Sequence, residues 1–144
     1  MNVRDAQETD FGRVTELLEQ LGRPRVADES YATARQIYLD QLEDEYSHHM
    51  VAVDEGQVVG FCSLHFRSRL NQATLQAWIP DLFVDPSSRG RGAAKALLLE
   101  AERVARGRGC HDLTLESGFE RSEAHLLYSA AGMKEVGKSF WKAL

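Results

Sequence analysis

The stretch from Leu82 to Ala105 constrains the fold more than any other part of the 144-residue sequence. It begins with a short apolar run that ends at Val84 and has the composition of a β-strand. Pro86 ends this strand, because proline has no N–H group to donate to a neighbouring strand. From Ala94 onward, apolar residues recur at helical spacing. A strand therefore leads into a glycine-rich turn, and the turn opens a helix.

The glycine-rich turn contains Arg89, Gly90, Arg91 and Gly92 directly before the helix. The first turn of a helix has N–H groups without intrahelical partners, and the helix dipole adds positive potential there. The glycines let a phosphate approach these donors, and the arginines suit a pyrophosphate. A Rossmann fingerprint needs a glycine where Lys95 stands, and the Gly-Lys-Ser/Thr ending of a P-loop is absent. On its own, the turn is equally compatible with two solvated arginines on a tight bend.

With its flanking residues, the turn resembles the acetyl-coenzyme A loop of the GNAT N-acetyltransferase superfamily. Arg89, Gly92 and Ala94 fill the family pattern Arg/Gln-x-x-Gly-x-Gly/Ala, and Val84-Asp85-Pro86 fills the Val-x-Pro strand end. The resemblance implies acetyl-coenzyme A as co-substrate and an oxyanion-stabilising backbone N–H near Leu82 or Phe83. The implied cofactor-binding residues are Leu82, Phe83, Val84, Arg89, Gly90, Arg91, Gly92, Ala93 and Ala94.

A second motif lies at Ala124 to Met133, which looks like the GNAT pattern Ala-x-x-x-Tyr-x-x-x-Gly-Phe with methionine at its last position. In that family the tyrosine protonates the departing thiolate, and the resemblance assigns this role to Tyr128. A phenol with a pKa of about 10 is protonated at neutral pH and can act as an acid. A packing role is the alternative for this residue. Arg121 departs from the family, because many members have an asparagine there. The run from Ser117 resembles a small-amine subgroup that includes aminoalkylphosphonate N-acetyltransferase.

An amine acceptor arrives mainly as ammonium and must lose a proton before it attacks. Asp81 stands where many family members have a glutamate, and it is a candidate base, acting directly or through water. The alternative is a strand-end carboxylate paired with an arginine. Glu116 and His65 are further candidates. The pair His48-His49 indicates a metal only weakly, so no metal site is expected.

Length and composition fit one domain spanning residues 1–144. The net charge of −5 disfavours nucleic-acid partners. Cys62 and Cys110 are isolated, which indicates neither a disulfide framework nor a zinc site. The polar N-terminus and the absence of a long apolar run indicate no signal peptide and no membrane partner. A cytoplasmic protein is expected.

The patterning predicts an α+β fold with a mixed central β-sheet and about four helices. Strands are expected at 3–6, 50–53, 58–66, 74–84 and 113–115. A hairpin turn is expected at 54–57, a bulge or splay at Pro80, and burial of the strand at 113–115. Helices are expected at 11–21, 29–43, 94–105 and 122–131, with Ile37 and Tyr38 on the apolar side of the second. A final hairpin is expected within 136–144, which makes a homodimer plausible. This element order is that of the GNAT fold, and the resemblance covers nearly the whole chain.

The preferred interpretation is an enzyme, an N-acetyltransferase that moves the acetyl group of acetyl-coenzyme A to the primary amine of a small molecule by direct attack. One alternative is a noncatalytic acyl-coenzyme A sensor that kept the loop and lost the chemistry. Another is an interaction domain with a solvated Arg-Gly turn. Tyr128 at the acid position favours the enzyme.

Overall fold

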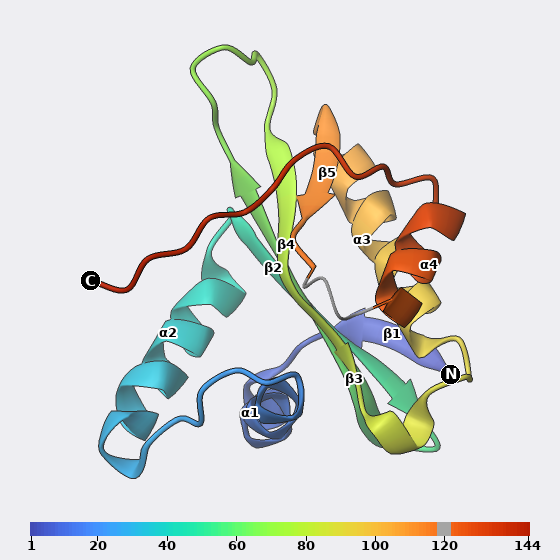
Figure 1. Ribbon diagram of the computed structural model, residues 1–144. Coiled ribbons are helices and arrows are strands. Elements are labelled where there is room, and N and C mark those ends of the chain that lie inside the picture. Colours follow the sequence, from blue (N-terminus) through green and yellow to red (C-terminus); the bar gives the residue numbers. More distant parts are fainter. Residues whose placement is uncertain (118–121) are drawn as a thin grey trace. The chain divides into compact units, whose positions relative to one another are not determined.

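The computed structural model describes residues 1–117 and 122–144 (Figure 1). The chain forms two compact units, residues 1–114 and 115–144. The first unit holds most of the sheet and three of the helices, and the second holds the last described helix. The prediction of one domain across 1–144 stays a prediction.

The sheet has five strands in sequence order, and the first four are antiparallel to their neighbours. The backbone N–H of His111 donates to Leu75 O at 3.0 Å, so the last strand starts beside the start of the fourth and runs with it. This parallel pair makes the sheet mixed, as the patterning predicted. The strands are β1 (Asn2–Asp5), β2 (Ser47–Asp54), β3 (Gln57–Arg67), β4 (Gln76–Val84) and β5 (Asp112–Leu115).

Three helices cover the sheet of the first unit: α1 (Phe11–Gln20), α2 (Tyr31–Glu43) and α3 (Ala93–Gly107). One face of the sheet packs against α1 and α2, where Phe11 and Leu17 join a buried cluster with Phe61 and other strand residues (Figure 1). The other face packs against α3. A Cβ at Gly60 would lie 3.0 Å from Leu97 Cδ1, so this backbone position lies directly under the helix.

Two details of these elements differ from the patterning. Ile37, expected on the inner side of its helix, has 53% of its surface exposed, whereas the neighbouring Tyr38 is buried. The strand at 113–115, expected to be buried, is half-buried. The helix that contains Ile37 and the strand at 113–115 both mix apolar and polar positions. Their spacing alone therefore did not determine which side chains face the interior.

The predicted turn between β2 and β3 is confirmed. Glu55 and Gly56 both have positive φ values, 48° and 78°. Two consecutive left-handed residues match the twist of a tight β-hairpin. The turn fixes the register of β2 against β3.

The predicted bulge at Pro80 is also confirmed. Ser63 lies opposite Asp81, whereas His65 lies opposite Trp78, so β4 takes three steps where β3 takes two. Trp78 and Asp81 are three positions apart, so strict strand alternation would place them on opposite faces. With the bulge, both side chains lie on the face that carries α1 and α2.

The second unit contains α4 (Ser122–Ala130). Gly132 follows it with a φ of 83°, and Met133 N donates to Tyr128 O at 3.0 Å, which is a Schellman cap. Residues 133–144 form no helix or strand. The predicted final hairpin is therefore wrong: its apolar residues do not pair as strands. The homodimer prediction rested on this hairpin, and the hairpin no longer supports it.

Candidate functional site

The turn between β4 and α3 is anchored by Asp85. Its Oδ1 accepts hydrogen bonds from Ser87 N at 2.9 Å and Ser87 Oγ at 2.7 Å, which caps a short 3₁₀ turn at Pro86–Ser88. Its Oδ2 accepts from Arg13 Nη2 on α1. The Arg13 guanidinium, and then Ser87, lower the pKa of Asp85 to about 2. The carboxylate is therefore charged throughout the physiological range and holds the start of the turn to α1.

The two glycines of the turn have the backbone that a phosphate cradle needs. Gly90 and Gly92 have φ values of 80° and 84°, in the left-handed region that side chains disfavour. Gly92 is also the N-cap of α3, and its O accepts from Ala96 N at 2.9 Å. A Cβ on either glycine would meet no atom within 4 Å, so the space above the helix start is open. The residues fit a bound pyrophosphate.

The two arginines of the turn differ in their partners. Arg91 Nη1 donates to Asp54 Oδ2 at the end of β2, at 2.9 Å. The Arg89 guanidinium lies 5.8 Å from the centre of the Phe83 ring, and it forms no ion pair with a residue that the structure describes. Arg89 is therefore the better placed of the two to pair with a phosphate.

The edge of β4 that faces away from β3 carries the backbone N–H of Leu82, one of the two groups that the sequence offered as an oxyanion donor. Asp85 N donates to Val59 O at 2.8 Å, and in an antiparallel pair such bonds involve every second residue. Phe83 therefore points its N–H at β3, and Leu82 points its N–H at the other edge. β5 has four residues and starts beside Leu75, so it ends before it reaches Leu82. Of the two N–H groups that the sequence offered, that of Leu82 lies on the open edge.

The face of β2, β3 and β4 that packs against α1 and α2 carries polar side chains in two adjacent rows. One row is His49, Ser63 and Asp81, and the next is Ser47, His65 and Trp78. Ser63 is buried, and its Oγ has no hydrogen-bond partner among the described residues. A buried hydroxyl normally finds a partner in the protein or in bound molecules. This surface is therefore suited to a polar ligand.

Asp81 adopts the pairing that the sequence left open as its alternative. Its Oδ1 accepts from Arg23 Nε at 2.8 Å, and Arg23 Nη2 donates to Pro80 O at 2.9 Å. The Asp81 side chain is 21% exposed. One carboxylate oxygen is thus occupied by a guanidinium, and the group remains within reach of solvent.

His65 is half-buried on the row next to Asp81. Its Nδ1 lies 3.2 Å from Ser47 Oγ, and its ring lies 5.7 Å from that of His49 and 5.9 Å from that of Trp78. Burial lowers the pKa of His65, although the charges of Asp44 and Asp81 act in the opposite direction. The imidazole is therefore mainly neutral at pH 7.

His48 and His49 point to opposite faces of β2, as adjacent strand residues do. His48 Nε2 lies 2.8 Å from Asp5 Oδ1, and His49 Nε2 lies 2.7 Å from Gln41 Oε1. Burial, with smaller effects of His65 and His48, lowers the pKa of His49 to about 4. The two rings cannot converge on one metal ion.

The remaining candidates lie after the first unit. Tyr128 lies in α4, and Glu116 follows β5 directly. Arg121 lies outside the described residues. The helix predicted around Tyr128 is confirmed. The catalytic role of Tyr128 stays a prediction.

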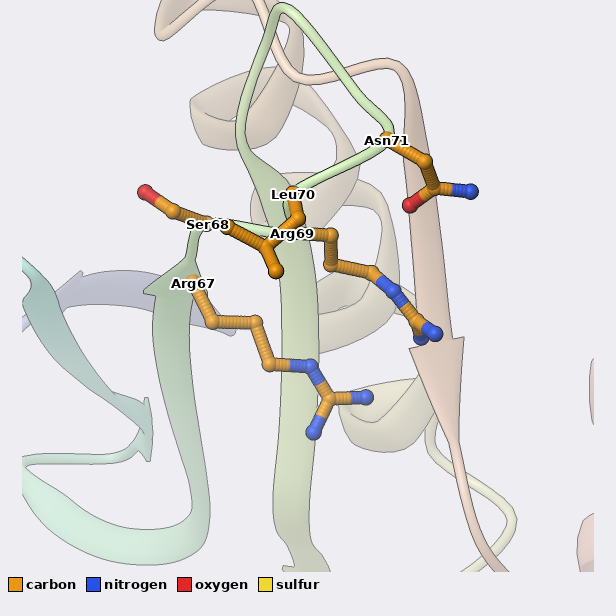
Figure 2. A pocket seen from close by; sticks show the side chains of 5 residues that line it. All are labelled: Arg67, Ser68, Arg69, Leu70 and Asn71. Atoms are coloured by element: carbon orange, nitrogen blue, oxygen red, sulfur yellow. The ribbon is translucent and has the colours of Figure 1, made fainter.

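A solvent-open hollow lies at the β3–β4 connection, lined by Arg67, Ser68, Arg69, Leu70 and Asn71 (Figure 2). Arg67 Nε donates to Gln76 Oε1 at 2.8 Å, and its guanidinium lies 4.8 Å from the centre of the Trp78 ring. Arg69 forms no ion pair among the described residues. The hollow is cationic and adjoins the row that contains His65.

Three residues of this surface were not singled out from the sequence: Arg13, Arg23 and Ser47. The two arginines bond carboxylates 72 and 58 residues away, and no local pattern signals such pairs. Ser47 had a local signal, because Asp44-x-x-Ser47 is typical of a side-chain-capped turn.

The strand, glycine turn and helix have the geometry that a phosphate-bearing cofactor requires. The chain matches the acetyltransferase (GNAT) family over residues 12–133. It is 34% identical over 114 residues to aminoalkylphosphonate N-acetyltransferase of Salmonella typhimurium, which covers 79% of this chain and 74% of that protein. The chain belongs to the GNAT acetyltransferase family, whose acetyl donor is acetyl-coenzyme A.

Other comparisons agree with this family. The chain is 33% identical over 90 residues to aminoglycoside N(6′)-acetyltransferase type 1 of Klebsiella aerogenes, over 58% of this chain and 57% of that one. A solved structure titled as a transcriptional regulator from Bacillus halodurans superposes with a TM-score of 0.89 at 21% identity, over 99% of both chains. The coenzyme A complex of aminoglycoside N-acetyltransferase AAC(6′)-Iy superposes with a TM-score of 0.79 at 20% identity, over 99% of this chain and 98% of that one. Among the described residues, no helix has the length and apolar character to cross a bilayer.

Proposed function

We propose that this chain transfers the acetyl group of acetyl-coenzyme A to the primary amine of a small molecule by direct attack. The observation that carries the proposal is the turn at Gly90 and Gly92. Two left-handed glycines open the N-terminus of α3, and the adjacent edge of β4 presents the Leu82 N–H beyond the end of β5. The opposite surface of the same strands carries the polar rows.

The donor-side residues would be those of the turn. The N–H groups at Gly92 to Ala94 and the Arg89 guanidinium would hold the pyrophosphate. The Leu82 N–H would stabilise the negative charge on the carbonyl oxygen as the amine attacks. The bound co-substrate supplies an acetyl thioester, which is already activated for transfer.

Tyr128 is proposed as the general acid that protonates the thiolate. The proposal rests on its place in the second family motif and on the neutral state of a phenol at pH 7. The Schellman cap that joins Met133 N to Tyr128 O ends α4 immediately after the motif's glycine. The backbone of Tyr128 is thereby fixed at the last turn of the helix.

Asp81 is proposed as the carboxylate that meets the ammonium group of the acceptor. One of its oxygens is held by Arg23, and the pair stands at the open end of the polar rows. A carboxylate held in this way keeps a fixed direction. It attracts a cationic amine to the strand that carries the Leu82 N–H.

The acceptor is proposed to carry an anionic group besides its amine. The hollow beside the polar rows presents the guanidinium groups of Arg67 and Arg69 (Figure 2), and these suit a phosphonate, phosphate or carboxylate. The name of the aminoalkylphosphonate relative is consistent with such an acceptor.

A panel of amines with purified protein and acetyl-coenzyme A tests the proposal, with thiol release as the readout. Aminoalkylphosphonates and ω-amino acids should react faster than uncharged amines of equal length. An Arg69→Gln variant should lose this preference while it keeps activity on uncharged amines. Heat of acetyl-coenzyme A binding without thiol release from any amine would instead indicate a noncatalytic acyl-coenzyme A sensor.

A further inference from the structure

We infer that His65 is the general base of the transfer, with Ser47 and Asp44 as the residues that position it. The inference rests on the proposed function and names the proton acceptor within that site. Its evidence is a chain of contacts in the first unit: Asp44 Oδ2 lies 3.5 Å from Ser47 Oγ, and Ser47 Oγ lies 3.2 Å from His65 Nδ1.

The direction of these hydrogen bonds follows from the chemistry of the three groups. An ionised carboxylate only accepts, so the single O–H of Ser47 donates to Asp44. The Ser47 oxygen must then accept from His65, which places the imidazole proton on Nδ1. The lone pair of the neutral ring is therefore on Nε2, the nitrogen that a base needs free.

The chain of contacts is held rigidly at its far end. Asp44 Oδ1 accepts from Tyr46 N at 3.0 Å, and Asp44 O accepts from Ser47 N at 3.1 Å. Ser47 and His65 are direct partners in the β2–β3 register. The ring is also fixed between those of His49 and Trp78. Among the described residues, none forms a hydrogen bond to His65 Nε2.

His65 lies on the same face of the sheet as the position where an amine would be held. Through the bulge at Pro80, Trp78 stands opposite His65 on that face, together with Asp81. The two polar rows are adjacent, so an ammonium held by Asp81 lies one row from His65. The unpartnered Ser63 hydroxyl, opposite Asp81, offers a further polar contact for the acceptor or for a bridging water.

His65 suits the task better than Asp81. One Asp81 oxygen is engaged by Arg23, whereas the imidazole is neutral at pH 7 and its Nε2 accepts no hydrogen bond from a described residue. The charged and titratable groups that face His65 are Asp44 before β2, His49 on β2 and Asp81 on β4. Both carboxylates stabilise the imidazolium that forms when the ring takes a proton. His49 remains neutral and does not oppose it.

During the transfer, the amine nitrogen loses two protons and the departing sulfur gains one. The ammonium gives one proton to Nε2 of His65, and the neutral nitrogen attacks the acetyl carbonyl carbon, forming the C–N bond. The nitrogen then loses a second proton to water while the C–S bond breaks, and the thiolate takes up one proton from the general acid, which water reprotonates. The products are the acetamide, free thiol and one proton released from His65 to solvent.

The kinetic test compares His65→Gln with His48→Gln as a matched control, since His48 lies on the other face of β2. His65→Gln should lower kcat/KM for the amine about 100-fold at pH 7, and the deficit should shrink as the pH approaches the amine's own pKa. The wild type should show an acidic limb that His65→Gln lacks, and His48→Gln should keep both rate and limb. Melting temperatures confirm that each variant is folded.

A kcat/KM within threefold of wild type in folded His65→Gln would overturn the inference. So would loss of the acidic limb in Asp81→Asn with the limb retained in His65→Gln, because the base would then be Asp81. If the wild type released no thiol with any amine, the proposed function itself would fail.

A second test needs no turnover. Long-range ¹H–¹⁵N NMR spectra distinguish the two neutral tautomers of a histidine, and His65→Gln assigns the signal. The Nδ1–H form should dominate at pH 7 in the wild type, and Ser47→Ala should give a mixture and lower kcat about tenfold with little change in KM. An Nε2–H tautomer in the wild type would overturn the inference whatever the kinetics.

Discussion

Arg13 on α1 and Asp85 at the end of β4 form an ion pair between residues 72 positions apart. The same guanidinium donates through Nε to Val58 O at 3.0 Å, so one side chain joins α1, β3 and the first residue of the glycine-rich turn. The turn is therefore held in place by a side chain from another element. Its shape depends on a helix that makes no contribution to the glycine motif.

This pair predicts a pH-dependent stability. The pKa of Asp85 falls to about 2 in the folded chain, against about 3.9 for a free aspartate. Its stabilisation should be complete above pH 4 and disappear as the pH falls through 2. Asp85→Asn should lower the free energy of unfolding by about 1–2 kcal/mol at pH 7, and the difference from wild type should vanish near pH 2. Urea unfolding at several pH values measures it, with the exposed Asp28→Asn as control. A difference that does not change with pH would exclude the ion pair as its cause.

A second prediction concerns the phosphate cradle. Gly92→Glu should place a carboxylate in the open space above the start of α3, where it would repel a pyrophosphate. Affinity for acetyl-coenzyme A should fall at least about tenfold, or 1.4 kcal/mol. Gly109→Glu is a matched control, since Gly109 also has a positive φ, 70°, and lies beyond the other end of the same helix. Calorimetry on both variants separates backbone strain from loss of the site. Equal affinities would mean that the phosphates bind elsewhere.

A third prediction concerns Asp81. Asp81→Asn removes the charge that is proposed to hold the ammonium, so KM for the amine should rise about tenfold while acetyl-coenzyme A affinity is unchanged. Because Arg23 is 53% exposed, loss of the ion pair should change stability by less than about 1 kcal/mol. Arg23→Gln leaves the carboxylate in place and should affect KM less. If the two variants raised KM equally, the pair would position the strand rather than bind the substrate.

A fourth prediction concerns Tyr128. Tyr128→Phe keeps the ring but removes the proton, so turnover should fall by about 10²–10⁴, with little change in cofactor affinity. Tyr31→Phe, which changes a ring that packs on Phe11, is the matched control. Melting temperature, cofactor affinity and thiol release should be measured on both. A rate within threefold of wild type would show that the Tyr128 hydroxyl is not the acid.

The sequence predicted the local elements well because each has a local cause. Gly90 and Gly92 mark a turn that needs positive φ, Pro80 marks the bulge, and Gly132 marks the helix end. The predicted final hairpin is wrong because the apolar residues near Phe140 have no turn signal between them that would pair them as strands. Apolar content alone does not specify pairing.

The site was only partly predictable for a different reason. The motif residues of the turn follow one another in the chain, and pattern finds them. The pairs Arg13–Asp85 and Arg23–Asp81 join distant residues, and the order of His65 against Ser47 depends on register. One histidine among apolar neighbours gives no sign of which nitrogen carries its proton. That information exists only once β2 and β3 are paired.

The bulge at Pro80 changes which alternate residues of β4 face α1 and α2. Before it, even-numbered residues such as Gln76 and Trp78 face α1 and α2; after it, odd-numbered residues such as Asp81 and Phe83 do. If β3 and β4 paired regularly with this proline retained, strict alternation would exchange the two surfaces of the first half of the strand. Trp78 would then turn into the space under α3, and Ile79 would take its place beside His65. Which residue of β4 faces His65 thus depends on whether the two strands pair through the bulge.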